Sequence, residues 1–415
     1  MSTNQAESGR RKGKQGTNER RLSGCWKKLT LLLVTVSLCL VVLEVAVRML
    51  TDVIPPVLVR HPVLGKTYRP HFDDRVWVPE AGREVRLRFN REGFRGPDVS
   101  EEKGEDVFRI AVIGDSFVAA VGVDEEQTAV RQLERMLNSS HPDRTWQVQN
   151  FGVSSSSTGQ EYVLYRELVA RYEPDVVVLV YSTLNDFTDN SSEMTTQSRI
   201  RFAVDDSGNL VREPMSVGRS AVTRWLQLHS RLYIWQKQLS DVVKHKAKDA
   251  IRPLSTESWI YSNEPSEQLR RVWLLNTRLL EAFHEEVEAR GSRFVLVVLP
   301  NANSVYDDLW NGVLTSAGEH RESFRRDHPE LRLSAIAGER GFDAVLMASE
   351  FRQATAGLSL SKTDPADWLF LNGTDHLNEN GNSLVARILY RFLTNSGESL
   401  PADAELSYSP EPESF

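Results

Sequence analysis

Short, mostly apolar runs alternate with longer amphipathic stretches between residues 108 and 395. Runs of this kind are typical of strands that are buried on both faces of a sheet. Alternation of such strands with helices predicts an α/β domain with a parallel sheet that helices cover on both faces. The predicted strands are Ile110–Ile113, Trp146–Gln149, Val176–Tyr181, Phe294–Leu299 and Ala344–Met347, and the predicted helices lie near 125–138, 159–172, 266–290, 331–340 and 379–394.

A different pattern occupies residues 29–50, where the first fifteen residues carry no charge and only Glu44 and Arg48 interrupt the apolar run. As a helix these residues would reach about 33 Å, enough to cross a hydrocarbon core of about 30 Å. The spacing of Glu44 and Arg48 places them one turn apart, where they can pair. We therefore predict a transmembrane helix, with a cleaved signal peptide as the alternative.

Charge is distributed unevenly along the chain. Residues 1–28 hold eight Lys or Arg against two Glu, a net charge of +6, which leaves −13 for the rest of the chain. A basic flank favours a cytoplasmic N-terminus, so the main body should lie on the other side of the membrane. Such a tail is expected to be disordered, and an acidic body argues against nucleic-acid binding.

Three further segments flank or interrupt the α/β pattern. Residues 51–107 predict a collar of short strands, because Val85–Phe89 alternates as a strand does and Trp77 and Phe94 favour packing over a loose linker. Residues 396–415 are acidic and rich in Pro, and we expect them to be disordered. Both cysteines, Cys25 and Cys39, lie before the collar, so no disulfide is expected to hold the main body.

The insertion at 190–265 contains apolar residues at helical spacing, among them Val222, Trp225, Trp235 and Leu239. One interpretation is a lid over a site, or a helix that rests on a membrane surface. The other, which we favour at this stage, is a helix packed on the core.

Polar residues follow several of the predicted strands. Gly114-Asp115-Ser116 comes after the first strand, residues 150–157 after the second and residues 183–186 after the third, while residues 373–378 precede the last helix. Because the carboxyl ends of parallel strands lie at one edge of a sheet, we expect these four segments to converge. Asp115 is expected to hold the turn that carries Ser116 through backbone hydrogen bonds.

The residue types in these segments suit acyl transfer. Ser116 is a candidate nucleophile, which needs a base, and His376 is a suitable base. A carboxylate would fix the tautomer of the histidine. The Ser116 N–H, the Gly152 N–H and the Asn185 side-chain amide are candidate donors for the oxyanion. Each residue taken alone is more typical of an ordinary turn or helix start, so the hypothesis depends on their order and placement.

Taken in order, Gly-Asp-Ser-Phe, Asn-x-Gly, Asn-Asp and a late His-Leu-Asn resemble the SGNH/GDSL hydrolase family over roughly 108–190 and 290–395. Its four signature residues map to Ser116, Gly152, Asn185 and His376. The collar sequence from Asn90 to Gly96 resembles that of membrane-anchored members. The resemblance implies a flavodoxin-like α/β/α fold, ester hydrolysis and no metal or cofactor; relatives include O-acetyltransferases of extracytoplasmic polysaccharides.

Two positions depart from the pattern of this family. Thr183 stands where the third motif usually has glycine, which would narrow the site. The fourth motif usually has Asp two or three residues before the histidine, where this chain has Thr374 and Gly373. Asp375 is the predicted orienting acid of His376, with a backbone carbonyl, Asp364 or Asp367 as alternatives.

These observations predict a serine esterase of SGNH type in the cell (inner) membrane, anchored by one span, with the N-terminus in the cytoplasm and the catalytic domain extracytoplasmic. Its expected partners are a small-molecule or carbohydrate ester and the membrane. Two alternatives remain open. One is an O-acyltransferase that acetylates an extracytoplasmic polysaccharide, and the other is an inactive carbohydrate-binding or assembly protein.

Overall fold

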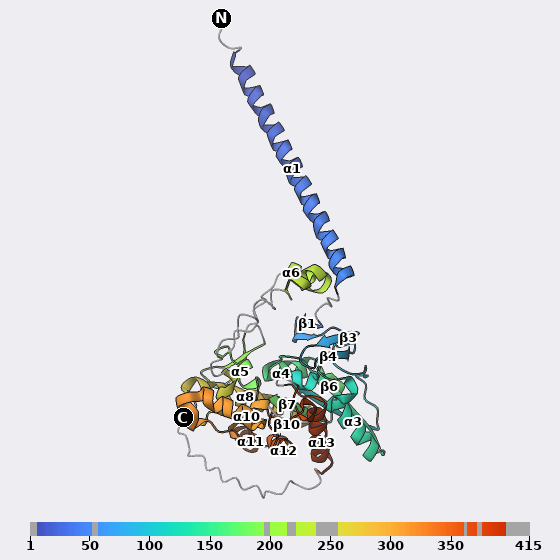
Figure 1. The fold of residues 1–415 in the computed structure, drawn as a ribbon, viewed down its shortest axis with the longest axis vertical. Coiled ribbons are helices and arrows are strands. Elements are labelled where there is room, and N and C mark those ends of the chain that lie inside the picture. Colours follow the sequence, from blue (N-terminus) through green and yellow to red (C-terminus); the bar gives the residue numbers. More distant parts are fainter. Residues whose placement is uncertain are drawn as a thin grey trace. The chain divides into compact units, whose positions relative to one another are not determined.

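The computed structural model describes residues 6–51, 57–194, 200–213, 221–237, 256–360, 363–371 and 376–395 (Figure 1). The chain forms two compact units. The first contains residues 1–56 and 219–250, and the second contains residues 57–218 and 251–415. We call the second the catalytic unit because it contains the candidate catalytic residues of the sequence analysis.

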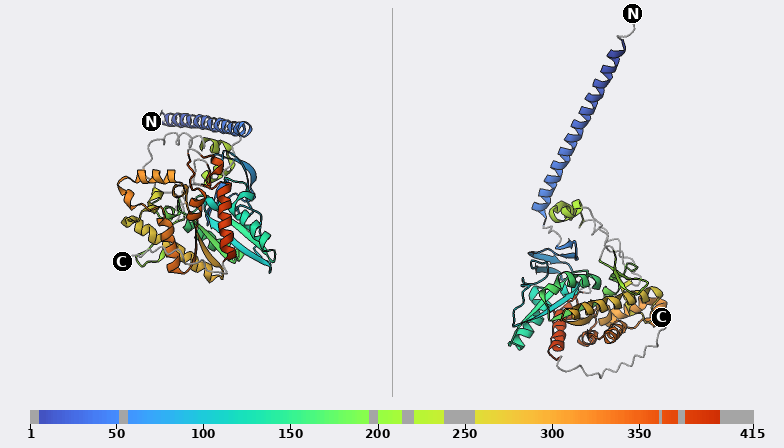
Figure 2. Two further views of the ribbon diagram at one scale, coloured as in Figure 1. Left: turned by 60° about the horizontal axis from the view of Figure 1, so that its bottom comes forward. Right: turned by 180° about the vertical axis from the view of Figure 1, so that it is seen from behind.

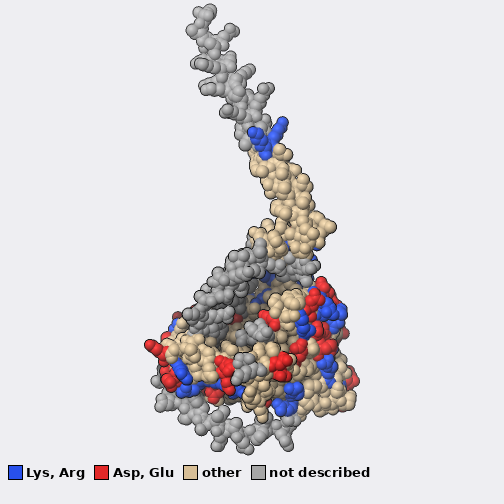
Figure 3. Space-filling model, viewed as in Figure 1, with Lys and Arg blue, Asp and Glu red and all other residues tan. Residues whose placement is uncertain are grey.

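The first unit is built on one long helix, α1 (Ala6–Leu50). Its part from Trp26 to Leu50 is long and apolar enough to cross a membrane, as a signal sequence or an anchor would be. In Figure 3 this stretch starts with a pair of basic side chains and then shows uncharged residues over most of its length. The helix begins at Ala6, whereas the basic tail was expected to lack structure, because extending an existing helix through Arg, Lys and Gln costs little.

Glu44 joins two parts of the first unit. Arg48 Nε donates to Glu44 Oε1 at 2.8 Å, which confirms the predicted pair. Glu44 also accepts hydrogen bonds from Ser230 Oγ at 2.8 Å and from the N–H of Arg231 at 2.8 Å. The segment that starts helix 231–237 is thereby held to the end of α1.

The insertion helix α6 (Ala221–His229) belongs to this first unit and not to the core of the catalytic unit. Val222 is 66% exposed and Trp225 is 58% exposed. Within the first unit these large apolar side chains are exposed; the predicted helix is present, and its packing on the core stays a prediction. Leu239, part of the same pattern, lies outside the described residues.

The catalytic unit contains a five-stranded parallel sheet in the order β11-β10-β7-β5-β6. Counted along the chain, this is the flavodoxin-like order 2-1-3-4-5, whose switch point lies between the first and third strands. All five predicted strands and the α/β fold class are confirmed. Their bounds are β5 (Val107–Gly114), β6 (Thr145–Gly152), β7 (Val176–Ser182), β10 (Arg293–Leu299) and β11 (Asp343–Leu346).

Alternate side chains of the strands pack into two hydrophobic cores, one on each face of the sheet. On one face, Ile110 and Val112 pack with α3 (Ala129–Ser140), α12 (Ala348–Ala354) and α13 (Glu379–Asn395). On the other, Ala111 and Ile113 pack with helices that include α4 (Thr158–Glu167), α8 (Glu267–Ala289) and α11 (His328–Arg340). Figure 2 shows the resulting three layers.

The five predicted helices are confirmed to within a few residues, although two of them are broken. The first divides into η1 (Glu125–Gln127) and α3, and the second into α4 and η2 (Val169–Tyr172). Besides α12, several further short elements were not predicted, because three to eleven residues give little periodic signal. They are α2 (Ser116–Ala119), α5 (Asp186–Asp189), β8 (Phe202–Val204), β9 (Leu210–Arg212), η3 (Thr256–Tyr261), α9 (Ala302–Val305), α10 (Asp307–Ala317), η4 (Gly318–Ser323) and η5 (Pro365–Asp367).

The collar consists of two antiparallel hairpins that belong to the catalytic unit. The first pairs β1 (Leu58–His61) with β2 (Gly65–Tyr68), and the second pairs β3 (Asp73–Val78) with β4 (Arg83–Arg88). Phe89 and Phe94 are buried, and the ring of Tyr68 stacks on that of Phe89 at 4.2 Å. The collar is thus packed against the rest of the catalytic unit.

Candidate active site

Ser116 is the first residue of α2, directly after strand β5. Asp115 is buried and its carboxylate accepts the N–H of Phe117 at 2.9 Å, so it caps the single turn that carries the serine. This confirms the structural role expected for Asp115. Ser116 itself is only partly buried while its neighbours on both sides are buried, so its hydroxyl is presented at the edge of the sheet.

His376 lies against this hydroxyl, with Nε2 at 2.8 Å from Ser116 Oγ. The two residues are 260 positions apart in the sequence. The loop of His376 is fixed by the Leu371 N–H, which donates to the His376 carbonyl at 2.7 Å, and by the bridge between Phe370 and Leu377. The structure therefore brings together the predicted nucleophile and the predicted base.

The other imidazole nitrogen contacts a residue that the sequence did not suggest. His376 Nδ1 lies 2.6 Å from Oε2 of Glu80, which sits in the turn between β3 and β4 of the collar. The hydrogen bond from His376 lowers the pKa of Glu80, so this carboxyl is ionised at neutral pH and can only accept. Nδ1 then carries the hydrogen, and Nε2 is left to accept the Ser116 O–H.

The structure describes two of the three acids that the sequence suggested for this role. Asp375, the predicted orienting acid, lies outside the described residues. Asp364 accepts the N–H of Ala366 at 2.9 Å and caps η5, where Asp367 is the last residue. Glu80 was not predicted because its local sequence contains no motif. The lack of Asp at positions 373 and 374 indicated only that the acid had to come from elsewhere.

Gly152 occupies the end of β6, where α2 packs closely over it. A Cβ atom at this position would lie within 3.0 Å of backbone atoms of Val118 and Ala119. Its N–H donates to Asn150 Oδ1 at 2.9 Å, so in this arrangement the bond needed for an oxyanion is already used. The donor role of Gly152 therefore stays a prediction that requires this bond to be exchanged, and close packing already accounts for a glycine at this position.

Asn185 caps α5 and lies among carboxylates close to Ser116. Its Nδ2 donates to Asp189 Oδ2 at 3.2 Å and to the Ser156 carbonyl at 3.4 Å, and its amide also bonds Asp115. The residue before Ser116 and the predicted donor Asn185 are therefore in contact. Asn185 stands in the expected place, with its amide shared among several acceptors.

Thr183 does not narrow the site as its departure from the family pattern suggested. Its hydroxyl donates to the Leu299 carbonyl at 3.2 Å and accepts the Asn301 N–H at 3.2 Å. Both partners belong to the end of β10, on the side of β7 away from β5. The threonine therefore ties two strand ends together and faces away from Ser116.

Two carboxyls beneath the site differ from Glu80 in their environment. Burial raises the pKa of Asp115 to about 6. Burial and the nearby Asp115 raise the pKa of Asp186 well above its ordinary value, although Asp186 accepts the N–H of Ser182 at 2.8 Å and of Thr158 at 3.0 Å. These contacts join the ends of β7 and α4, which is a structural role.

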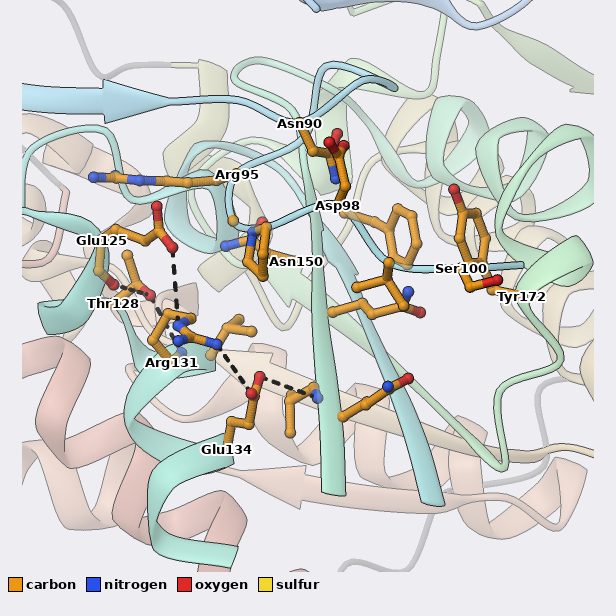
Figure 4. A pocket seen from close by; sticks show the side chains of 18 residues that line it. Asn90, Arg95, Asp98, Ser100, Glu125, Thr128, Arg131, Glu134, Asn150 and Tyr172 are labelled. Atoms are coloured by element: carbon orange, nitrogen blue, oxygen red, sulfur yellow. Dashed lines mark hydrogen bonds and ion pairs between the residues drawn. The ribbon is translucent and has the colours of Figure 1, made fainter. Parts of the chain in front are cut away.

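A separate cavity of about 280 Å³ lies between the collar residues 95–100, α3 and strand β6 (Figure 4). Neither Ser116 nor His376 lines it. Arg131, which projects into it, pairs with Glu134 at 3.0 Å and Glu125 at 3.9 Å. The charges of this cavity therefore compensate one another, and it is distinct from the candidate active site.

Comparison with known proteins gives a likeness only to solved structures. No protein-family model matches the sequence, and no curated protein matches it. Three of the similar structures are a catalytic mutant of the acetylxylan esterase Axe2 from Geobacillus stearothermophilus, the acetyl xylan esterase AlAXEase, and CEX, a two-domain esterase active on acetylated mannans.

All three are 14% identical to this chain. For Axe2 the TM-score is 0.37, with 68% of this chain and 93% of the other covered. For AlAXEase the TM-score is 0.36, with 68% of this chain and 98% of the other covered. For CEX the TM-score is 0.36, with 74% of this chain and 53% of the other covered. These structural neighbours are esterases. The fold of this chain is assigned from its own strand order and not from this likeness.

Proposed function

We propose that this protein is a serine esterase of SGNH type, with Ser116 as nucleophile and His376 as general base. The observation that carries the proposal is the 2.8 Å contact between Ser116 Oγ and His376 Nε2. It joins two distant segments at the carboxyl end of β5, next to the switch point of the sheet, where open α/β sheets place their ligands.

The chemistry follows from this contact. Ser116 Oγ attacks the ester carbonyl while its proton moves to Nε2 of His376. The Ser116 N–H is the first donor to the resulting oxyanion, and the Asn185 amide and the Gly152 N–H would join it by exchanging the hydrogen bonds that they make in this structure. The tetrahedral intermediate expels the alcohol, which takes the proton from His376. Water then repeats these steps on the acyl-enzyme and releases the acid.

We further propose that α1 anchors the protein in the cell (inner) membrane, with the catalytic unit outside the cytoplasm. The length and apolar character of Trp26–Leu50 and the basic residues before it support this topology. The substrate class is an acyl, and most simply an acetyl, ester of a small molecule or carbohydrate. Transfer of the same acyl group to a sugar hydroxyl instead of water would make the protein an O-acyltransferase.

The test uses the full chain purified in detergent micelles. A fluorophosphonate probe should label the wild-type protein on Ser116, and p-nitrophenyl acetate should be hydrolysed; Ser116→Ala should show neither. Product analysis with and without a polysaccharide acceptor separates hydrolase from transferase. Absence of labelling and turnover in the folded wild-type protein would favour the inactive binding or assembly protein.

A further inference from the structure

The collar reaches the active site through the turn between β3 and β4, the position of Glu80. In the family that this sequence resembles, the carboxylate next to the histidine comes from two or three residues before it. Here those positions hold Thr374 and Gly373, neither of which has a carboxylate. Glu80, 296 positions away in the sequence, instead lies 2.6 Å from His376 Nδ1.

The same turn is fastened to the segment that carries the histidine by a second contact. Arg83 Nη2 donates to Oε1 of Glu379 at 2.6 Å, and Glu379 comes three residues after His376. Arg83 Nη1 also pairs with Asp124 at 3.1 Å. Two side chains of one hairpin therefore contact this segment. Glu80 contacts the imidazole of His376, and Arg83 contacts Glu379, the first residue of α13.

The hairpin is itself held in place by packing and by charge. On β4, Val85 and Leu87 are fully or almost fully buried, while the intervening arginines point outward. The Arg86 N–H donates to Asp124 Oδ1 at 3.1 Å, and Arg88 pairs with Glu125 at 2.9 Å. These contacts fix the turn relative to the catalytic unit, so the carboxylate of Glu80 has a defined position.

A second part of the collar supports the nucleophile. The Arg95 side chain is 3% exposed and donates to the carbonyls of Ala119, Ala120 and Val123, which follow the turn that carries Ser116. Ala120, at the end of this turn, has a left-handed backbone with φ of 46°. Arg95 thus holds a backbone conformation that is uncommon outside glycine.

We propose that Glu80 is the positioning residue that orients His376, and that the collar completes the active site. This inference rests on the proposed esterase function. Glu80 keeps the hydrogen on Nδ1, so that Nε2 takes the proton from Ser116, and its negative charge stabilises the imidazolium that forms. The proton moves only between Ser116 Oγ, Nε2 and the leaving alcohol; Glu80 stays ionised throughout.

The decisive variant is Glu80→Gln, measured in the full chain with p-nitrophenyl acetate. We expect kcat to fall by about 10²–10⁴-fold with KM little changed, because the amide no longer selects the reactive tautomer. The acidic limb of the kcat/KM profile should also move to lower pH, because the negative charge that favours the protonated imidazole is gone. A merely structural role of Glu80 would not move this limb.

Glu84→Gln is the matched control, since Glu84 is an exposed residue of the same hairpin and carries the same charge. It should leave both the rate and the pH profile unchanged. Should Glu80→Gln fold poorly by circular dichroism, Glu80→Asp tests the same point. It keeps the charge one methylene further away, and we expect a loss of about 10-fold with the acidic limb at its wild-type position.

The outcomes separate this inference from the proposed function. A wild-type protein without esterase activity or labelling contradicts the function itself. An active wild type with an unchanged Glu80→Gln variant overturns the role of Glu80 alone. A loss in Asp375→Asn that matches the expected loss, with Glu80→Gln unaffected, would assign the orienting role to Asp375 instead.

Discussion

The sheet and the collar of the catalytic unit are stabilised by different kinds of interaction. Strand β7 is buried along its whole length, and its side chains enter the apolar cores on both faces of the sheet. The collar instead is fastened largely by arginines, with Arg83, Arg88 and Arg95 each reaching a distant residue or carbonyl. The sheet is organised by burial, whereas the collar adds directed hydrogen bonds and ion pairs to a smaller set of buried side chains.

This difference matters because each region contributes one side of the imidazole. The sheet edge presents Ser116 to Nε2, while the collar presents Glu80 to Nδ1. Burial fixes the nucleophile with little dependence on solution conditions. Partly exposed ion pairs, by contrast, are weakened by salt and contribute little to global stability, so the pairs of Arg83 at the turn of Glu80 can affect activity with little effect on folding.

The largest expected effect tests the sheet side. Ser116→Ala should lower esterase turnover by at least about 10³-fold and abolish fluorophosphonate labelling, because the nucleophile is lost. Turnover is measured with p-nitrophenyl acetate and labelling by gel fluorescence. Ser140→Ala, at an exposed end of α3, should behave as wild type, and equal labelling of both variants would argue against Ser116.

The next effect tests how tightly the sheet side is packed. Gly152→Ala should lower the free energy of unfolding by about 3 kcal/mol, because the new methyl group meets the backbone of α2, which cannot move aside easily. Denaturant unfolding followed by tryptophan fluorescence measures this. Gly312→Ala in α10 has open space around its Cβ and should instead stabilise the helix by about 0.5–1 kcal/mol. A harmless Gly152→Ala would contradict the close approach.

A third prediction concerns Glu330, a buried carboxyl whose pKa is raised, whereas that of Glu80 is lowered. Glu330 in α11 is 5% exposed, neither of its carboxylate oxygens has a partner on another described residue, and burial raises its pKa to about 7. The folded pKa lies above the unfolded value, so this group's stabilisation is present at low pH and is lost as pH rises through about 7.

Glu330→Gln should remove this dependence. Relative to wild type, the variant should gain up to about 3 kcal/mol of stability between pH 4 and pH 8. Urea unfolding at the two pH values provides the measurement. A difference between variant and wild type that is the same at both pH values would show that Glu330 ionises normally.

The smallest effect tests the collar side. Arg83→Met removes the pairs with Asp124 and Glu379 and should lower kcat by about 10-fold, because the turn that carries Glu80 is less firmly held. The melting temperature should change little, since both pairs are partly exposed. Arg75→Met, at an exposed position of β3, is the control. A large loss of stability with normal kcat would reverse the proposed distinction between the two regions.

The sheet and two residues of the candidate site, Ser116 and His376, could be predicted from local sequence patterns. Continuous apolar runs mark the buried strands, and Ser116 and His376 follow from short motifs at their ends. Glu80 could not be found this way, because a contact between two polar side chains 296 positions apart leaves no periodicity. Gly152 is a different case: the close packing of α2 explains why the position is a glycine, while its role as an oxyanion donor stays a prediction.

The outward-facing insertion helix shows a further limit. Trp225 and Val222 recur at helical spacing whether they face a core or the surface, so the pattern predicts a helix without its surroundings. Contacts of Glu44 with the segment at 230–232 and of Arg48 with the His229 carbonyl show that this part of the insertion joins α1.

The central claim is that Ser116 carries the acyl group during turnover. The most direct test is to quench the full-length protein with acid during hydrolysis of p-nitrophenyl acetate and to analyse its peptides by mass spectrometry. The account predicts one acetyl group on the peptide that contains Ser116, more of it in Glu80→Asp if deacylation slows, and none in Ser116→Ala. Rapid turnover with an acetyl group only on another residue, or with equal acetylation in Ser116→Ala, would contradict it.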